Sequence, residues 1–111
     1  MVLFSCTKKA PELMEMAQTS LDQNQEDQAI ANLNDLLEKY PDDSLASLAQ
    51  YKLATIYKSW KNDPKNLLEA LNKTVNKYPD TPQATQAKKE IQAFQDWIIN
   101  NAETLRKRKM T

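Results

Sequence analysis

The sequence has no glycine, no histidine and only one cysteine among its 111 residues. Without glycine there is no loop of the kind that cradles phosphate groups, and no tight turn that presents a nucleophilic serine. Without histidine the chain lacks the commonest metal ligand and the commonest general acid or base. One cysteine cannot form a disulfide within the chain, and no apolar run approaches the roughly 20 residues of a membrane span. These absences argue against an enzyme and predict no cofactor and no metal site.

The residues that are abundant favour helices. Alanine, leucine, glutamine, glutamate and lysine are frequent, and all have high helix propensity. No segment alternates apolar and polar residues as a strand does, and no hairpin-type Asn-Gly or Asp-Gly turn occurs. A chain of this length forms one domain. The sequence therefore predicts a single all-α domain.

The sequence also repeats itself. The segment LLEKYPDDSLASLAQYKLATIY, residues 36–57, returns in part as VNKYPDTPQATQAKKEI, residues 75–91. Tyr40 and Tyr78 are 38 positions apart, and so are Ala46 and Ala84. A fixed period of this size is typical of a solenoid, in which each repeat is covered by its neighbour.

Apolar residues at helical spacing predict five helices, separated by proline-containing or polar segments. Either Asp42, Asp43 or Ser44 is expected to cap the third helix, and Asp63 and Thr81 to cap the fourth and fifth. The expected helices are residues 11–21, 26–40, 45–60, 64–78 and 82–105. They are expected to form two helical hairpins and a closing helix. The chain is thus divided into a tether at residues 1–10, a helical domain at 11–105 and a basic tail at 106–111.

The charge is zero overall but unevenly distributed. Residues 1–55 carry a net charge of −5 and residues 56–111 a net charge of +5, which fits either polarised partner contacts or two solvated faces. The run Arg106-Lys107-Arg108-Lys109 fits anionic lipid or phosphate on one interpretation, and a solubilising helix end on the other. The second is favoured. Because no basic stripe occurs elsewhere, nucleic acid is not an expected partner.

The segment Leu3-Phe4-Ser5-Cys6 resembles the bacterial lipobox, in which a signal peptidase cleaves before a cysteine that is then acylated. The resemblance implies lipidation of Cys6 and membrane association through that anchor. Only five residues precede Cys6, with no basic or long apolar stretch among them, so the signal segment would be truncated. The alternative is a free thiol near the chain terminus.

The whole pattern resembles the tetratricopeptide-repeat (TPR) family. Ala17, Ala29 and Pro41 reproduce the family's spacing of small residues and proline, whereas the second unit is one residue longer and has Leu67 in place of the expected alanine. The motifs KYPDD and KYPDT, each followed by alanines at helical spacing, are similar to a subgroup from the Gram-negative cell envelope. That subgroup includes the BamD-type lipoprotein of outer-membrane assembly and the Tol-Pal-associated periplasmic protein. The resemblance implies a TPR-like α-solenoid that binds protein.

In such arrays the first helix of each repeat lines a groove for a protein or peptide partner. By register, the resemblance places nine residues in that groove: Met14, Gln18, Leu21, Tyr51, Lys52, Thr55, Lys58, Lys89 and Trp97. The tyrosine and tryptophan would be rigid anchors, and the lysines would attract an acidic segment. Alternatively, the aromatic residues belong to the core and the lysines to a solvated face.

We therefore expect a non-catalytic, protein-binding scaffold, anchored by lipid at the periplasmic face of the outer membrane. The competing prediction is a soluble repeat module, cytoplasmic if the lipobox match is accidental. Such a module would pack on a larger complex or on itself, without a free groove or an anchor. Neither prediction fixes the oligomeric state.

Overall fold

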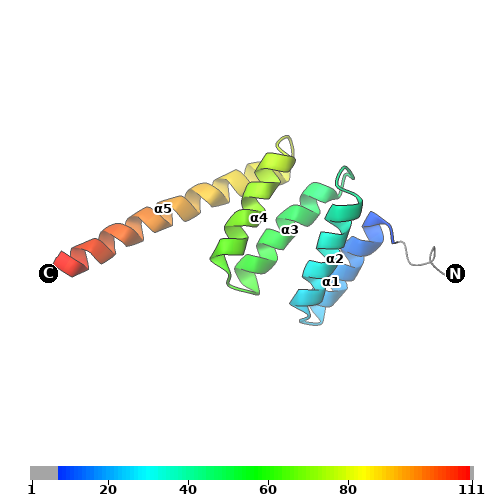
Figure 1. Ribbon diagram of the computed structural model, residues 1–111, viewed down its shortest axis with the longest axis horizontal. Helices are drawn as coiled ribbons and strands as arrows, with labels where there is room; N and C mark the ends of the chain where they lie inside the picture. The colour runs from blue at the N-terminus through cyan, green and yellow to red at the C-terminus, as the bar shows by residue number, and fades with distance from the viewer. Residues whose placement is uncertain (1–7, 111) are drawn as a thin grey trace.

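The fold is all-α, as predicted, and the expected five helices are present (Figure 1). The computed structural model describes residues 8–110, and within this range the side chains of all residues except 105 and 108–110. The helices are α1 (Ala10–Asp22), α2 (Glu26–Lys39), α3 (Ala46–Ser59), α4 (Pro64–Lys77) and α5 (Pro82–Met110). The last helix continues through the start of the basic segment at residue 106.

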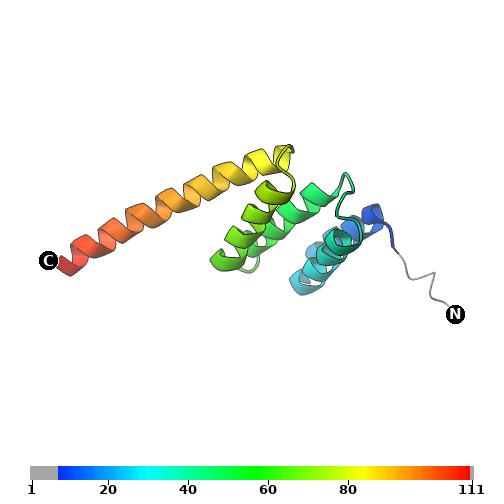
Figure 2. The same cartoon turned by 45° about the horizontal axis from the view of Figure 1, so that its top comes forward.

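The helices pack as sequential hairpins. α1 lies against α2 and α3 against α4; α2 contacts α3, and α5 packs on α4 and α3 (Figures 1 and 2). The core holds large side chains from four of the helices, among them Leu13, Leu33, Ile56 and Leu71. The repeated alanines are fully buried where helices approach closely: Ala17, Ala29, Ala46, Ala49, Ala84 and Ala87. Small residues at helical spacing permit that approach, which explains why the sequence period predicted the packing.

Asparagine replaces glycine in the turn of each hairpin. Asn24 (φ 58°) and Asn62 (φ 52°) are the residues with positive φ in the described part of the chain. The left-handed conformation is disfavoured for most residues with a Cβ, and asparagine tolerates it best after glycine. Asn24 follows Ala17 by seven residues and Asn62 follows Ala54 by eight, so the extra residue of the second repeat is accommodated before this turn.

The tyrosine of each KYP motif fastens the open end of its own hairpin. Tyr40 donates a hydrogen bond to the carbonyl oxygen of Lys8, 2.6 Å away, just before α1. Tyr78 donates to the carbonyl oxygen of Pro41, 2.9 Å away, in the segment before α3. Each bond joins the end of the second helix to the chain that enters the first. The motif thus has a structural role in both repeats.

Helix capping agrees with the sequence at α4 and α5 but not at α3. Asp63 accepts a hydrogen bond from the backbone amide of Asn66 (3.1 Å), and Thr81 accepts one from Ala84 (3.1 Å). The expected cap of α3 was wrong. Its N-cap is Leu45, and the Asp43 carboxylate accepts from the Leu45 amide instead (2.8 Å). An additional turn lies between Asp43 and the helix, which places the carboxylate too early to cap it.

The second half of α5 extends away from both hairpins, which makes the molecule elongated, 69 × 31 × 20 Å (Figures 1 and 2). α5 has 29 residues, whereas α4, on which it packs, has 14. Within residues 8–110, no helix is long and apolar enough to cross a membrane.

Candidate protein-binding site

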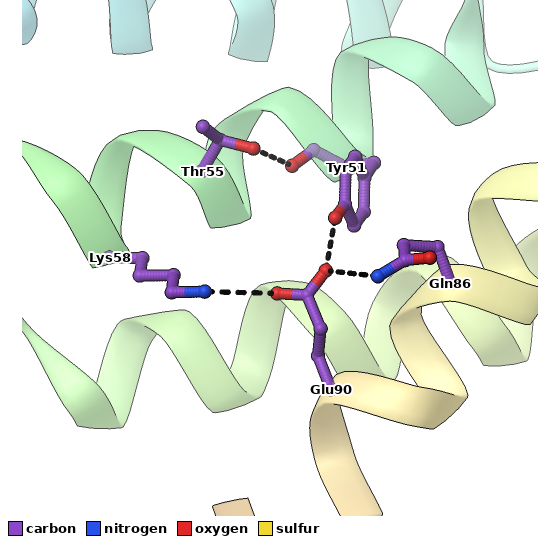
Figure 3. Close-up of polar contacts among 5 residues, drawn as sticks. All are labelled: Tyr51, Thr55, Lys58, Gln86 and Glu90. Atoms are coloured by element: carbon purple, nitrogen blue, oxygen red, sulfur yellow. Dashed lines mark hydrogen bonds and ion pairs between the residues drawn. The ribbon is translucent and has the colours of Figure 1, made fainter. Parts of the chain in front are cut away.

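The contact between α3 and α5 is organised around one carboxylate, that of Glu90 (Figure 3). The Tyr51 hydroxyl, from α3, donates a short hydrogen bond to Glu90 Oε2. Lys58 Nζ, two turns further along α3, lies 3.8 Å from Glu90 Oε1. Within α5, Gln86 Nε2 donates to Glu90 Oε2 over 3.4 Å. Glu90 therefore joins two first helices of successive repeats.

The electrostatics of this contact follow from its partial burial. Burial is the largest cause that raises the pKa of Tyr51 to about 12, and the hydrogen bond to Glu90 and the negative charge of Glu90 raise it further. The Glu90 side chain is only 20% exposed. Since its oxygens are engaged by a hydroxyl, an amide and an ammonium group, Glu90 offers little free negative charge to a partner. Within the ion pair, the charges of Glu90 and Lys58 offset each other.

Of the groove residues expected on α3 and α5, Tyr51 and Lys58 take part in this contact, whereas Trp97 lines a cleft. Tyr51 and Lys58 are engaged with Glu90, while Thr55 is exposed and donates from Oγ1 to the Tyr51 carbonyl (3.3 Å). Lys52 is half-buried and Lys89 is exposed. Whether these lysines bind a partner stays a prediction.

The three groove residues expected on α1 are placed differently. Met14 is half-buried, and the exposed Gln18 donates to Asp22 over 3.0 Å, within its own helix. Leu21 is only 8% exposed and packs in the hydrophobic core. Leu21 therefore presents no side chain to a groove, whereas Met14 and Gln18 remain at least partly accessible.

Trp97 lines an apolar cleft of about 520 Å³ that adjoins the Glu90 contact at Lys58. The cleft lies between the α3–α4 turn, the start of α4 and the middle of α5. Its lining residues are Tyr57, Lys58, Asn62, Asp63, Pro64, Leu67, Phe94, Trp97 and Ile98. The rings of Phe94 and Trp97 stack with centroids 6.3 Å apart and an angle of 11° between their planes. Trp97 is 61% exposed, so it is not a core residue.

Two features explain why the cleft is apolar. Leu67 occupies the position at which the first repeat has the fully buried Ala29, and this larger side chain lines the cleft. The Asp63 carboxylate accepts hydrogen bonds from the side chain and the backbone of Asn66, and these lower its pKa. Because Asp63 is used by the helix cap, the cleft presents mainly apolar side chains.

Sequence reasoning missed Glu90, Phe94 and the cleft. Glu90 directly follows the expected groove residue Lys89, but nothing in its local pattern shows that Tyr51 points at it. A signal for the cleft did exist. Ala87, Ile91, Phe94 and Ile98 form an apolar stripe at helical spacing on an expected helix, 82–105, that is longer than the expected helix before it, 64–78.

The tetratricopeptide-repeat pattern matches residues 13–43 and 48–81, which together make up more than half of the chain. The protein therefore belongs to the tetratricopeptide-repeat family, whose stacked repeats act as protein-binding scaffolds. The match covers nearly all of α1 to α4 and ends just before α5. No curated protein and no solved structure matches the chain. Among the residues that the structure describes, no three potential acidic, histidine or cysteine ligands converge on a possible metal position.

Proposed function

We propose that the protein is a non-catalytic scaffold that captures a partner through an acidic segment laid over α3 and α5. The observation that carries the proposal is the Glu90 contact. It joins the two helices, and the partners of Glu90 leave its carboxylate little free charge to repel an acidic segment. Lys58 pairs with Glu90 and stays exposed, while Lys52 and Lys89 follow Tyr51 and precede Glu90 in the sequence and are half-buried and exposed, respectively. Such a surface attracts carboxylates and gains rigidity from the tyrosine.

The test reverses the charge of two of these lysines. We expect Lys52→Glu with Lys89→Glu to weaken partner capture from a membrane extract, measured by quantitative mass spectrometry of the bound proteins. The matched control is Lys73→Glu with Lys77→Glu, two exposed positions on α4 that give the same change in net charge. Equal capture by the two double variants, at equal helical content, would remove the support for this surface.

A separate proposal concerns where in the cell the protein is located. We propose that Cys6, which lies outside the described residues, is lipidated and holds the protein at the periplasmic face of the outer membrane. The support comes from the sequence: the Leu3–Cys6 pattern and the KYPDD and KYPDT motifs, which resemble envelope proteins of the BamD and Tol-Pal-associated types. Metabolic labelling with a radioactive fatty acid tests it. Label in the native protein but not in Cys6→Ser is the expected result, and an unlabelled native protein would refute the anchor.

A second candidate function, a structural module that packs on a larger complex or on itself, is favoured by one observation. Trp97, Ile98 and Ile99 are consecutive large apolar residues that are each more than 40% exposed. Large apolar patches on a protein surface mark sites of contact with other molecules.

A further inference from the structure

Most of the large apolar side chains that are exposed lie at one end of the molecule. In the described part of the chain they are Leu48, Trp60, Trp97, Ile98 and Ile99. Trp60 is the C-cap residue of α3 and belongs to the turn that leads into α4, whereas Trp97 and Ile98 lie in the middle of α5. This turn and this part of α5 line the same apolar cleft. We call Trp60, the cleft, Trp97 and Ile98 the apolar end.

Both tryptophans of the chain belong to the apolar end. Trp60 is 41% exposed and Trp97 is 61% exposed, although tryptophan has a large apolar surface to gain from burial. Its ring joins an apolar body to a polar N–H group, and such side chains are enriched at the boundary between lipid and water. Exposed apolar residues that are grouped in one place mark a site of contact.

Cations follow the apolar residues along α5. Arg106 and Lys107 are exposed and come about 12–14 Å beyond Ile98 along the helix. At about 100° per residue, Arg106 lies about 80° around the helix from Ile98. Lys107 lies at about the same angle from Trp97. Because long basic side chains reach around a helix while their methylene groups rest on apolar surface, both cations can approach a surface that the apolar end enters.

The nearby acids do not oppose an anionic surface. On α5, Asp96 and Glu103 lie about 160° and 140° around the helix from Ile98, so they are on the other side of it. At the cleft, the carboxylate of Asp63 accepts hydrogen bonds in the cap of α4, and Lys65, two residues further on, is exposed. The free charge beside the apolar end is therefore mainly positive.

The basic run at residues 106–109 gains a different interpretation from this arrangement. The sequence alone favours a solubilising role for it. In the structure the run continues α5 without a break, and the helical turns before it expose Trp97 and Ile98. A solubilising role accounts for the cations but not for the exposed apolar residues beside them. A lipid surface with negative headgroups accounts for both.

The shape of this end also favours a lipid surface. In both views the α3–α4 turn and the C-terminal end of α5 lie on the lower side of the molecule, so one broad surface can touch both (Figures 1 and 2). Beyond the cleft α5 projects alone, and no second described element forms a groove with it. A fluid bilayer adapts to a projecting apolar and basic helix. Nucleic acid would pair with the cations only and leave the apolar residues in water.

We propose that the apolar end binds the surface of a bilayer that contains anionic lipids. Trp60, Trp97 and Ile98 enter the boundary between headgroups and acyl chains, while Arg106 and Lys107 contact the headgroup phosphates. The contact requires neither the proposed acylation nor the lysines that are substituted in the capture test, so it is independent of both earlier proposals.

The expected binding is reversible and depends on the charge of the lipid. Each basic residue near an anionic membrane surface strengthens binding about fivefold, so that Arg106 and Lys107 together contribute about 25-fold. Burial of a few apolar side chains adds to this contribution. We therefore expect binding to vesicles of phosphatidylcholine mixed with phosphatidylglycerol, and binding at least about 25-fold weaker to phosphatidylcholine alone.

Tryptophan fluorescence tests the contact directly, because both tryptophans lie in it. The full chain carrying Cys6→Ser, which excludes acylation, is titrated with the two kinds of vesicle. With the anionic vesicles the emission should shift to shorter wavelengths, and lipids brominated in their acyl chains should quench it. Trp60→Phe and Trp97→Phe should each retain part of the shift, from the remaining tryptophan. Loss of the whole shift in either variant, or an equal shift with both kinds of vesicle, would overturn the proposal.

Charge reversal tests the cations by sedimentation with anionic vesicles. Arg106→Glu with Lys107→Glu should weaken binding by at least about 25-fold. The matched control is Lys73→Glu with Lys77→Glu, which makes the same change in net charge at exposed positions near the opposite end of α4. This control should bind nearly as well as the unsubstituted chain. Equal weakening by the two double variants would show that only net charge matters and would refute the site.

The apolar contribution is tested in the same assay. Trp60→Ala with Trp97→Ala should weaken binding at least about tenfold. Leu48→Ala is the control, because it removes an exposed large apolar side chain (38%) near the start of α3 and should leave binding unchanged. Unchanged binding by the tryptophan variant would contradict insertion into the bilayer.

An acidic protein segment is the other possible occupant of the apolar end. In that case Arg106→Glu with Lys107→Glu would lose protein capture from the membrane extract, and the unsubstituted chain would not bind vesicles. That result would refute the lipid contact. The lipid contact predicts the reverse: vesicle binding is lost in this variant, and capture through the surface over α3 and α5 is retained.

Discussion

Removal of the Tyr51 hydroxyl is the most direct test of the contact that joins α3 to α5. In Tyr51→Phe the Glu90 carboxylate loses a hydrogen bond from a partly buried donor. Hydrogen bonds to charged groups contribute about 1.5–3 kcal/mol. Glu90 keeps Gln86 and Lys58 as partners, and the site is partly solvated, so we expect a loss of about 1–2 kcal/mol in the free energy of unfolding.

The assay is urea denaturation followed by circular dichroism, with Tyr51→Phe, Glu90→Gln and the double variant compared in a double-mutant cycle. The two single losses should be non-additive, with a coupling energy of about 1 kcal/mol between residues in direct contact. Additive effects within about 0.3 kcal/mol would show that the two side chains do not interact in solution. In that case the Glu90 contact would not be what fixes α5 against α3.

Three further predictions concern the same fold. The pKa of Tyr51 is raised from 10.0 to about 12. The contribution of its hydroxyl to the free energy of unfolding is therefore complete below pH 10 and is lost as the pH rises towards 12. Urea midpoints should fall over that range, and less so in Tyr51→Phe. Tyr40→Phe and Tyr78→Phe should each lower the free energy of unfolding by about 0.5–1.5 kcal/mol; an effect in only one of them would contradict the equivalence of the two KYP motifs. Leu33→Ala, at a fully buried position, should cost about 2–5 kcal/mol by the same denaturation assay, and a smaller loss would indicate a core that is less well packed.

The sequence predicted the helices and the repeat well, because both depend on local information. Helical spacing of apolar residues, proline after Tyr40 and Tyr78, and small residues at a period of 38 specify where helices begin, end and approach one another. The cap of α3 was missed because the segment after Pro41 makes an additional turn before the helix, and turn geometry is only weakly encoded by composition.

The candidate site was predicted only in part. The lysines and Tyr51 were inferred from family register, and α3 and α5 do meet there. Glu90, the shared partner of Tyr51 and Lys58, was not inferred, because its role depends on the rotation of α5 about its own axis when it packs on α4. Leu21 shows the opposite error. The register of the family pattern predicted that it lines a groove, but it packs in the hydrophobic core.

The sequence by itself determined the class of fold: an all-α tandem repeat without glycine or histidine, with asparagine at the turns. Only the tertiary structure decided which surfaces are available. Exposure depends on what lies opposite a helix face, and the α3–α4 hairpin ends before the apolar stripe of α5 does. Phe94, Trp97 and Ile98 therefore line an open cleft instead of a core, although the same helical spacing buries Ala84 and Ala87 completely.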